Sequence, residues 1–180
     1  MQISKRNGQS EEYDVEKIHK VVQWATEGLN GVSLSDIEMN ANLSLYDGIT
    51  TSEIQQVLIK SANDLIAEAT PNYQYVAARL LNMQLRKEVW SGGKNAPIFF
   101  DFIAVRIDNG VYDPTILEKW SKEDIDKLET LINHARDDLF TYAGLQQLID
   151  KYLVKNRSTG EIFETPQFAY MCIAMCLFDT

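Results

Sequence analysis

The sequence has little cysteine and little histidine, with two of each among its 180 residues. Two cysteines, Cys172 and Cys176, do not make a disulfide framework, and in a reducing compartment we expect them to remain thiols. The histidines, His19 and His134, stand far apart without cysteines or carboxylates at metal-ligand spacing. We therefore expect that this chain binds no metal directly.

Basic residues are also scarce. Lysine and arginine total 17 against 26 aspartates and glutamates, which gives a formal net charge of -9. Surfaces that bind a nucleic-acid backbone need clustered cations, so we expect no nucleic-acid partner. The chain does not open with a charged segment followed by an apolar one. No secretory signal is therefore visible, and the cytoplasm is the expected location.

The sequence also has no apolar run long enough to span a membrane. The run from Phe168 to Phe178 has 11 residues, whereas a bilayer-spanning helix needs about 20. It is apolar at every position and hence on every helical face, so we expect it to be buried all round. We infer that the surface covering it belongs to a missing partner, either a separate chain or a region removed by truncation.

Against this acidic background, cations gather near the start of the chain. Lys5 and Arg6 precede Asn7-Gly8, a strong hairpin signal because both central residues of a type I′ turn need positive φ. We therefore expect a β-hairpin that carries Lys5 and Arg6 beside its turn. On charge patterning alone, these two cations are typical of a solvated hairpin tip.

A helix is expected directly after the second strand. Asp14 stands at the N-cap position, and Val15, Ile18 and Val22 follow at helical spacing. Lys17 lies in the first turn, where a cation opposes the positive end of the helix dipole. That placement favours an anion that shares the site.

Further signals define a first domain over residues 1–91, a small α+β unit in which four helices cover the hairpin. They are Ser33 or Ser35 as a helix cap, the capping box of Thr50 and Glu53, Pro71, and the linker Ser91-Gly92-Gly93.

A second, helical domain is expected over residues 95–180. Its predicted helices are Ile98 to Ile107, Pro114 to Lys119, Lys122 to Ala135, Leu139 to Lys151, and a last helix opened by Pro166. Between the last two, Tyr152 to Val154 and Ile162 to Phe163 predict a second β-hairpin. The fold class of the whole chain is mainly α (α+β).

Several runs of residues, in order along the chain, resemble one known family. They are Trp24 to Leu29, Tyr46 to Ile49, Thr50 to Ile54, Pro71 to Arg79, Leu85 to Lys87, Lys151 to Val154 and Thr159 to Ile162. The sequence resembles the N-terminal part of class I ribonucleotide reductase large subunits of the phage and enterobacterial type, in which an ATP cone precedes a helical region. The resemblance covers essentially the whole chain but does not reach the barrel that holds the family's catalytic cysteines.

The resemblance implies an allosteric segment without catalytic residues. Its cone would bind ATP or dATP, with Mg²⁺ accompanying the nucleotide, and regulate the reduction of ribonucleoside diphosphates to deoxyribonucleotides for DNA synthesis. The catalytic residues are then expected on a complementing chain or a missing region. The implied partners are the remainder of the large subunit and a radical-generating small subunit, in the host cytoplasm if the protein is of phage origin.

The resemblance also implies nine nucleotide-binding residues. Phosphate contacts are carried over to Lys5, Arg6, Lys17 and Lys87, adenine contacts to Glu11 and Asp14, and further contacts to Thr51, Gln55 and Gln84. Thr51 is also read locally as a helix-capping residue. Gln55 and Gln84 stand where family members with strong dATP inhibition carry histidines. Glutamine donates hydrogen bonds but cannot become cationic, so the response to dATP stays open.

Two alternatives come from other classes of protein. The first is a freestanding ATP-cone nucleotide sensor, as in transcription repressors that also carry a zinc ribbon and a basic face, both of which are absent from this sequence. The second is a helical interaction module whose cone no longer binds nucleotide. Cys172 and Cys176 lie one helical turn apart in an apolar helix, where we expect small hydrophobic side chains rather than a redox pair.

Overall fold

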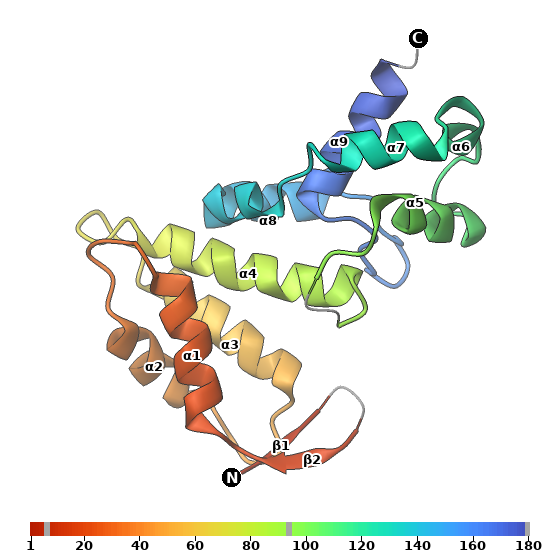
Figure 1. The fold of residues 1–180 in the computed structure, drawn as a ribbon. Helices are drawn as coiled ribbons and strands as arrows, with labels where there is room; N and C mark the ends of the chain where they lie inside the picture. The colour runs from red at the N-terminus through yellow and green to blue at the C-terminus, as the bar shows by residue number, and fades with distance from the viewer. Residues whose placement is uncertain (6–7, 93–94, 179–180) are drawn as a thin grey trace. The chain divides into compact units, whose positions relative to one another are not determined.

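The computed structural model describes residues 1–5, 8–92 and 95–178. The chain is mainly helical with one two-stranded antiparallel hairpin at its N-terminus, which confirms the predicted fold class (Figure 1). Two compact units are present, one of residues 1–84 with 140–145 and one of residues 85–139 with 146–180. The division falls within a helix, and the predicted domain limits at 91 and 95 stay a prediction.

The first unit packs its helices beside the hairpin. Its elements are β1 (Gln2–Ser4), β2 (Ser10–Glu12), α1 (Val15–Thr26), α2 (Leu34–Asn42), α3 (Thr51–Asp64) and the first part of α4 (Tyr73–Val89). Helix α2 contacts both α1 and α3, and Figure 1 shows these three helices beside one another. The core is apolar and fully covered, with Val22, Ile37, Ile49, Leu58, Val76 and Leu80 all at most 2% exposed.

The hairpin register differs by one residue from the predicted turn. Ser4 pairs with Ser10, and the Lys5 N–H donates to the Gln9 carbonyl at 2.8 Å, so the loop encloses residues 6–8 rather than Asn7-Gly8 alone. Gly8 has a φ of +79°, as a turn glycine requires, while Asn7 lies outside the described residues. The prediction of a two-residue turn is wrong because the register that buries Ile3 leaves an odd number of loop residues.

Strand β1 also joins the hairpin to the start of α3. Ser4 forms a parallel bridge with Thr50, and its N–H donates to the Ile49 carbonyl at 3.0 Å. The Gly48 N–H donates to the Gln2 carbonyl at 2.8 Å. These bonds fix the N-terminus of α3 beside the end of β1.

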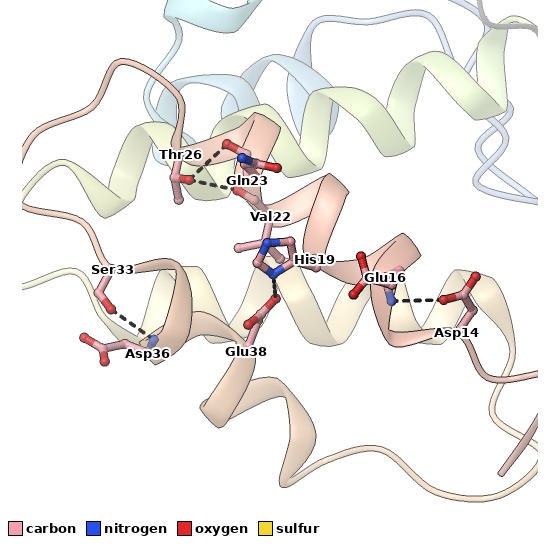
Figure 2. Close-up of polar contacts among 9 residues, drawn as sticks. All are labelled: Asp14, Glu16, His19, Val22, Gln23, Thr26, Ser33, Asp36 and Glu38. Carbon is pink, nitrogen blue, oxygen red and sulfur yellow. Dashed lines mark hydrogen bonds and ion pairs between the residues drawn. The ribbon is translucent and has the colours of Figure 1, made fainter.

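The predicted helix caps are confirmed. Asp14 accepts the Glu16 N–H at 3.0 Å and Ser33 accepts the Asp36 N–H at 3.2 Å, as Figure 2 shows. Thr50 and Glu53 form the predicted capping box at the start of α3. Thr50 is therefore the cap, and Thr51 is the first helical residue. Figure 2 also shows the His19 ring of α1 bonded to Glu38 of α2, with 3.0 Å between Nδ1 and Oε1.

The second unit holds the remaining helices. They are α5 (Phe99–Asp108), α6 (Thr115–Lys119), α7 (Lys122–Glu129), the 3-10 helix η1 (His134–Leu139), most of α8 (Tyr142–Lys151) and α9 (Pro166–Leu177). The helix predicted from Lys122 to Ala135 ends early, at Glu129. One physical reason is that the Asn133 side chain accepts the Ala135 N–H at 3.0 Å and so favours a separate turn.

The expected second hairpin is reduced to a single antiparallel bridge between Lys155 and Ile162. A side chain takes the place of further strand pairing, because the Val154 N–H donates to a Glu164 carboxylate oxygen at 2.7 Å. The Asn156 side chain, which accepts the Ser158 N–H at 2.9 Å, closes the loop instead. The region is therefore a bridged loop between α8 and α9.

Helix α9 is buried on one face within the described residues, and its burial all round by a missing partner surface stays a prediction. Phe168, Ala169, Cys172 and Met175 are buried. Phe168 stacks on Phe99 and packs against Phe102, with ring centroids 5.0 and 4.4 Å apart. The opposite face exposes Tyr170, Ile173 and Leu177 at 46%, 52% and 70%. Across the described ranges, no helix combines the length and apolarity needed to cross a membrane.

Candidate functional site

The hairpin and α1 bring two lysines and one carboxylate together. Lys5 Nζ lies 2.6 Å from one carboxylate oxygen of Glu11, and Lys17 Nζ lies 3.3 Å from the other. The Lys5 ammonium, followed by that of Lys17, holds the pKa of the Glu11 carboxyl below its usual value. The three side chains form a compact charged cluster, which we call the Lys5–Glu11–Lys17 cluster. Lys5 follows β1 directly, Glu11 belongs to β2 and Lys17 belongs to α1.

The strand register explains this meeting. Ile3 pairs with Glu11, and side chains two residues apart on a strand point to the same face. Lys5 therefore lies on the face of Ile3, which is buried against the helices. Lys17 reaches the same face from the first turn of α1.

Thr51 is held close to this cluster by the bridge between Ser4 and Thr50. It directly follows Thr50, as Lys5 directly follows Ser4, and its side chain is half-buried at the first position of α3. Helix N-termini present backbone N–H groups and the positive end of the dipole, which together attract anions. A second anion-attracting feature, the N-terminus of α3, is thus joined by the Ser4–Thr50 bridge to the strand end that Lys5 follows.

Asp14 has a structural role in this structure, because it caps α1 through the Glu16 N–H. It also lines an open hollow of about 480 Å³, formed by residues 11–17 at the corner of β2 and α1. Small-molecule sites usually measure about 300–1,000 Å³, so a nucleotide has room there.

The remaining predicted residues lie elsewhere or cannot be placed. Gln55 is 6% exposed, and its Nε2 donates to the Leu80 carbonyl at 2.8 Å, which ties α3 to α4. Gln84 is half-buried on α4, and Lys87 is exposed one turn later, in the second unit. Arg6 lies outside the described residues. Nucleotide contacts of all nine residues stay a prediction.

Two protein families match this chain. The ATP cone domain family matches residues 1–88, and the family described as the ribonucleotide reductase all-alpha domain matches residues 138–180. The chain therefore carries an ATP cone domain over residues 1–88 and a segment of the ribonucleotide reductase all-alpha domain over residues 138–180. The resemblance stated from the sequence is confirmed.

Individual relatives agree with the family matches. The chain is 44% identical over 177 residues to ribonucleoside-diphosphate reductase 1 subunit alpha of Escherichia coli, covering 98% of this chain and 23% of the relative. It is 46% identical over 177 residues to the alpha subunit of Enterobacteria phage T4, covering 97% and 23%. For the alpha subunit of Haemophilus influenzae the identity is 41% over 179 residues, covering 99% and 24%. The chain thus spans about a quarter of the length of these relatives.

The ion pair between Lys5 and Glu11 is a feature of the ATP cone that the sequence pattern does not predict. The family resemblance implies an adenine contact for Glu11, whereas the structure pairs Glu11 with Lys5. The two residues are diagonal neighbours across the hairpin, a relation that depends on the register. A loop of residues 6–8 would have predicted the contact, whereas the two-residue turn conceals it.

A second polar cluster lies inside the second unit, around η1. Arg86 donates to the His134 carbonyl and lies 3.8 Å from the Asp137 carboxylate and 3.4 Å from that of Asp138. Gln167, in the first turn of α9, donates to Asp137 at 3.1 Å. Burial raises the pKa of Asp137 to about 6, although Gln167 and Arg86 oppose the shift. Burial, aided by the charge of Arg86, lowers the pKa of His134 to about 4.

These two shifts predict opposite pH dependences of stability. Between about pH 4 and pH 6, Asp137 holds a proton only in the folded chain, so its contribution to stability falls as pH rises. His134 holds a proton only in the unfolded chain over that window, so its contribution rises with pH. As pH rises from 4.5 to 6.5, the unfolding free energy of Asp137→Asn should increase relative to that of wild type by about 1–3 kcal/mol.

Over the same rise in pH, the unfolding free energy of His134→Gln should decrease relative to that of wild type by a similar amount. Urea unfolding at several pH values measures both slopes. Parallel pH profiles for wild type and the two variants would show that neither group titrates as its burial requires.

Proposed function

We propose that this chain is the allosteric segment of a ribonucleoside-diphosphate reductase alpha subunit. Its ATP cone binds ATP or dATP, and occupancy biases the assembly or activity of the enzyme through differential affinity for two states. The observation that supports the proposal is the Lys5–Glu11–Lys17 cluster beside the N-terminus of α3, within the domain matched as an ATP cone. Calorimetric titration of the chain with ATP tests it.

The triphosphate is the part of the nucleotide that this site suits best. Ammonium and guanidinium groups form charge-assisted hydrogen bonds with phosphate oxygens, and these are stronger than neutral ones. We assign the phosphates to Lys5, Arg6, Lys17 and Lys87, and to the N-terminus of α3 at Thr51. Mg²⁺ is proposed to accompany the nucleotide, and the described ranges hold no cluster of metal-binding side chains.

The adenine base is assigned to the acidic side of the hollow. Glu11 and Asp14 carry carboxylates that accept hydrogen bonds from an exocyclic amine. Gln55 and Gln84 complete the proposed site from α3 and α4. One N–H of the Gln55 amide donates to the Leu80 carbonyl, so its second N–H and its oxygen remain for a ligand.

The remainder of the alpha subunit is the proposed partner of the all-alpha domain. The exposed face of α9 adjoins a groove of about 220 Å³ between α8 and α9, lined by Leu148, Tyr152, Leu153, Pro166, Ala169, Tyr170 and Ile173. Apolar surface of this kind marks a protein contact. The relatives share this segment and are about four times as long, so the covering surface is assigned to their remaining portion. A radical-generating small subunit and a cytoplasmic location belong to the same proposal.

Co-expression with a second chain that carries the remainder of the alpha subunit is expected to yield one complex. Ile173→Asp should abolish co-purification, because it places a charge at the centre of the apolar face. Ile98→Asp is the matched control, since Ile98 is 54% exposed against 52% for Ile173, and it should leave the complex intact. Two soluble chains that elute separately without any substitution would contradict the assignment.

A further inference from the structure

We propose that Glu11 is a built-in counter-ion of the ATP cone, which holds Lys5 and Lys17 in the nucleotide-free chain and must be displaced by an incoming triphosphate. The inference rests on the proposed function and adds to it how the site is regulated and how it selects adenine.

The geometry is that of a bridge. Each carboxylate oxygen of Glu11 takes one ammonium group, Lys5 Nζ at 2.6 Å and Lys17 Nζ at 3.3 Å. The Glu11 side chain is 25% exposed, against 41% for Lys5 and 61% for Lys17. The carboxylate therefore lies beneath two ammonium groups that reach it from β1 and α1.

A phosphate chain and this carboxylate compete for the positive charge of the same two ammonium groups. If the phosphates bound without displacing Glu11, like charges would face each other across the lysines, which is unfavourable at such short range. The carboxylate must therefore turn away as the phosphates arrive. Losing its two ion pairs opposes the binding of any polyphosphate, whatever base it carries.

The displaced carboxylate gains a new partner only if the ligand supplies a hydrogen-bond donor. The exocyclic amine of adenine is such a donor, whereas guanine presents a carbonyl oxygen at that position. ATP thus recovers part of the free energy that displacement costs, and inorganic tripolyphosphate recovers none. Glu11 is in this way a specificity-determining residue as well as a counter-ion.

Glu11→Gln tests the inference, because it removes the charge and keeps the size of the side chain. The matched control is Glu68→Gln, which removes the same charge from an exposed position of the first unit outside the hollow formed by residues 11–17. Calorimetry at fixed Mg²⁺ and salt compares wild type and both variants with ATP, GTP and inorganic tripolyphosphate. Circular dichroism checks that both variants remain folded.

Glu11→Gln is expected to bind tripolyphosphate about three- to tenfold more tightly than wild type, because the ligand no longer has to break two exposed ion pairs. Its preference for ATP over tripolyphosphate should shrink, and Glu68→Gln should change neither value. If wild type binds ATP but both variants gain equally for tripolyphosphate, the counter-ion role is wrong and the proposed function stands. If wild type binds none of the three ligands, the proposed function and this inference both fail.

Discussion

Replacing Lys5 and Arg6 together by alanine is expected to weaken ATP binding by about 100-fold or more. A hydrogen bond to a charged group contributes about 1.5–3 kcal/mol, and every 1.4 kcal/mol is a factor of ten in affinity. Two such donors are lost, and one of them, Lys5, directly follows Ser4, which bridges to Thr50 at the start of α3. Isothermal titration calorimetry of wild type and the double variant measures the difference.

The control for this double variant must remove the same charge without touching the site. Lys60 and Lys122 serve this purpose, because each pairs with an aspartate four residues later on an exposed helix face. Lys60→Ala with Lys122→Ala should leave ATP affinity within about a factor of two, as expected for surface charges. Unaltered binding heat in the Lys5 and Arg6 variant would instead favour the scaffold alternative, in which these cations form a solvated hairpin tip.

Phe168→Ala is expected to destabilise the second unit by about 3–5 kcal/mol, the range measured for large-to-small changes in aromatic cores. The side chain is 1% exposed and lies against Phe99, Phe102 and the His134 ring. Alanine would leave a cavity at the contact between α9, α5 and η1. Urea unfolding followed by far-ultraviolet circular dichroism measures the loss.

Phe178→Ala provides the comparison for this prediction. It makes the same substitution at the other end of α9, where the side chain is 72% exposed. Its effect should stay within about 0.5 kcal/mol, as for most surface positions. Equal effects of the two substitutions would mean that Phe168 is not a core residue of this unit.

Local hydrogen bonds made much of the fold predictable. The caps at Asp14, Ser33 and Thr50 depend on residues two or three positions apart, and Pro166 opens α9 because its ring suits the first helical turn. Helix spacing similarly predicted the course of α4 to Val89. Each of these signals lies within a few residues of the sequence, so the helix ends are predictable without knowledge of the tertiary structure.

Longer-range contacts account for the differences. The loop of the first hairpin follows from burial of Ile3, and the bridged loop after α8 follows from the Glu164 carboxylate, which takes a backbone N–H in place of a strand partner. The exposed face of α9 depends on which neighbours are present. None of these is readable from local pattern, because each is decided by packing between distant segments.

The candidate site was predictable in its residue types and not in its contacts. The cations and carboxylates near the hairpin stand out from an acidic sequence, and the family resemblance supplied their assignment to a nucleotide. The pairing of Glu11 with two lysines depends on strand register and on the entry of α1, and so needed the structure. Gln55 likewise looked available in sequence, while its amide nitrogen is bonded to α4.

Titration of the wild-type chain with ATP at constant Mg²⁺ is the most direct test of a nucleotide-binding cone. Saturable heat is expected, with an affinity that falls as salt is raised, because phosphate contacts made by lysines are screened by ions. A flat titration at ligand concentrations well above the millimolar range would contradict the account.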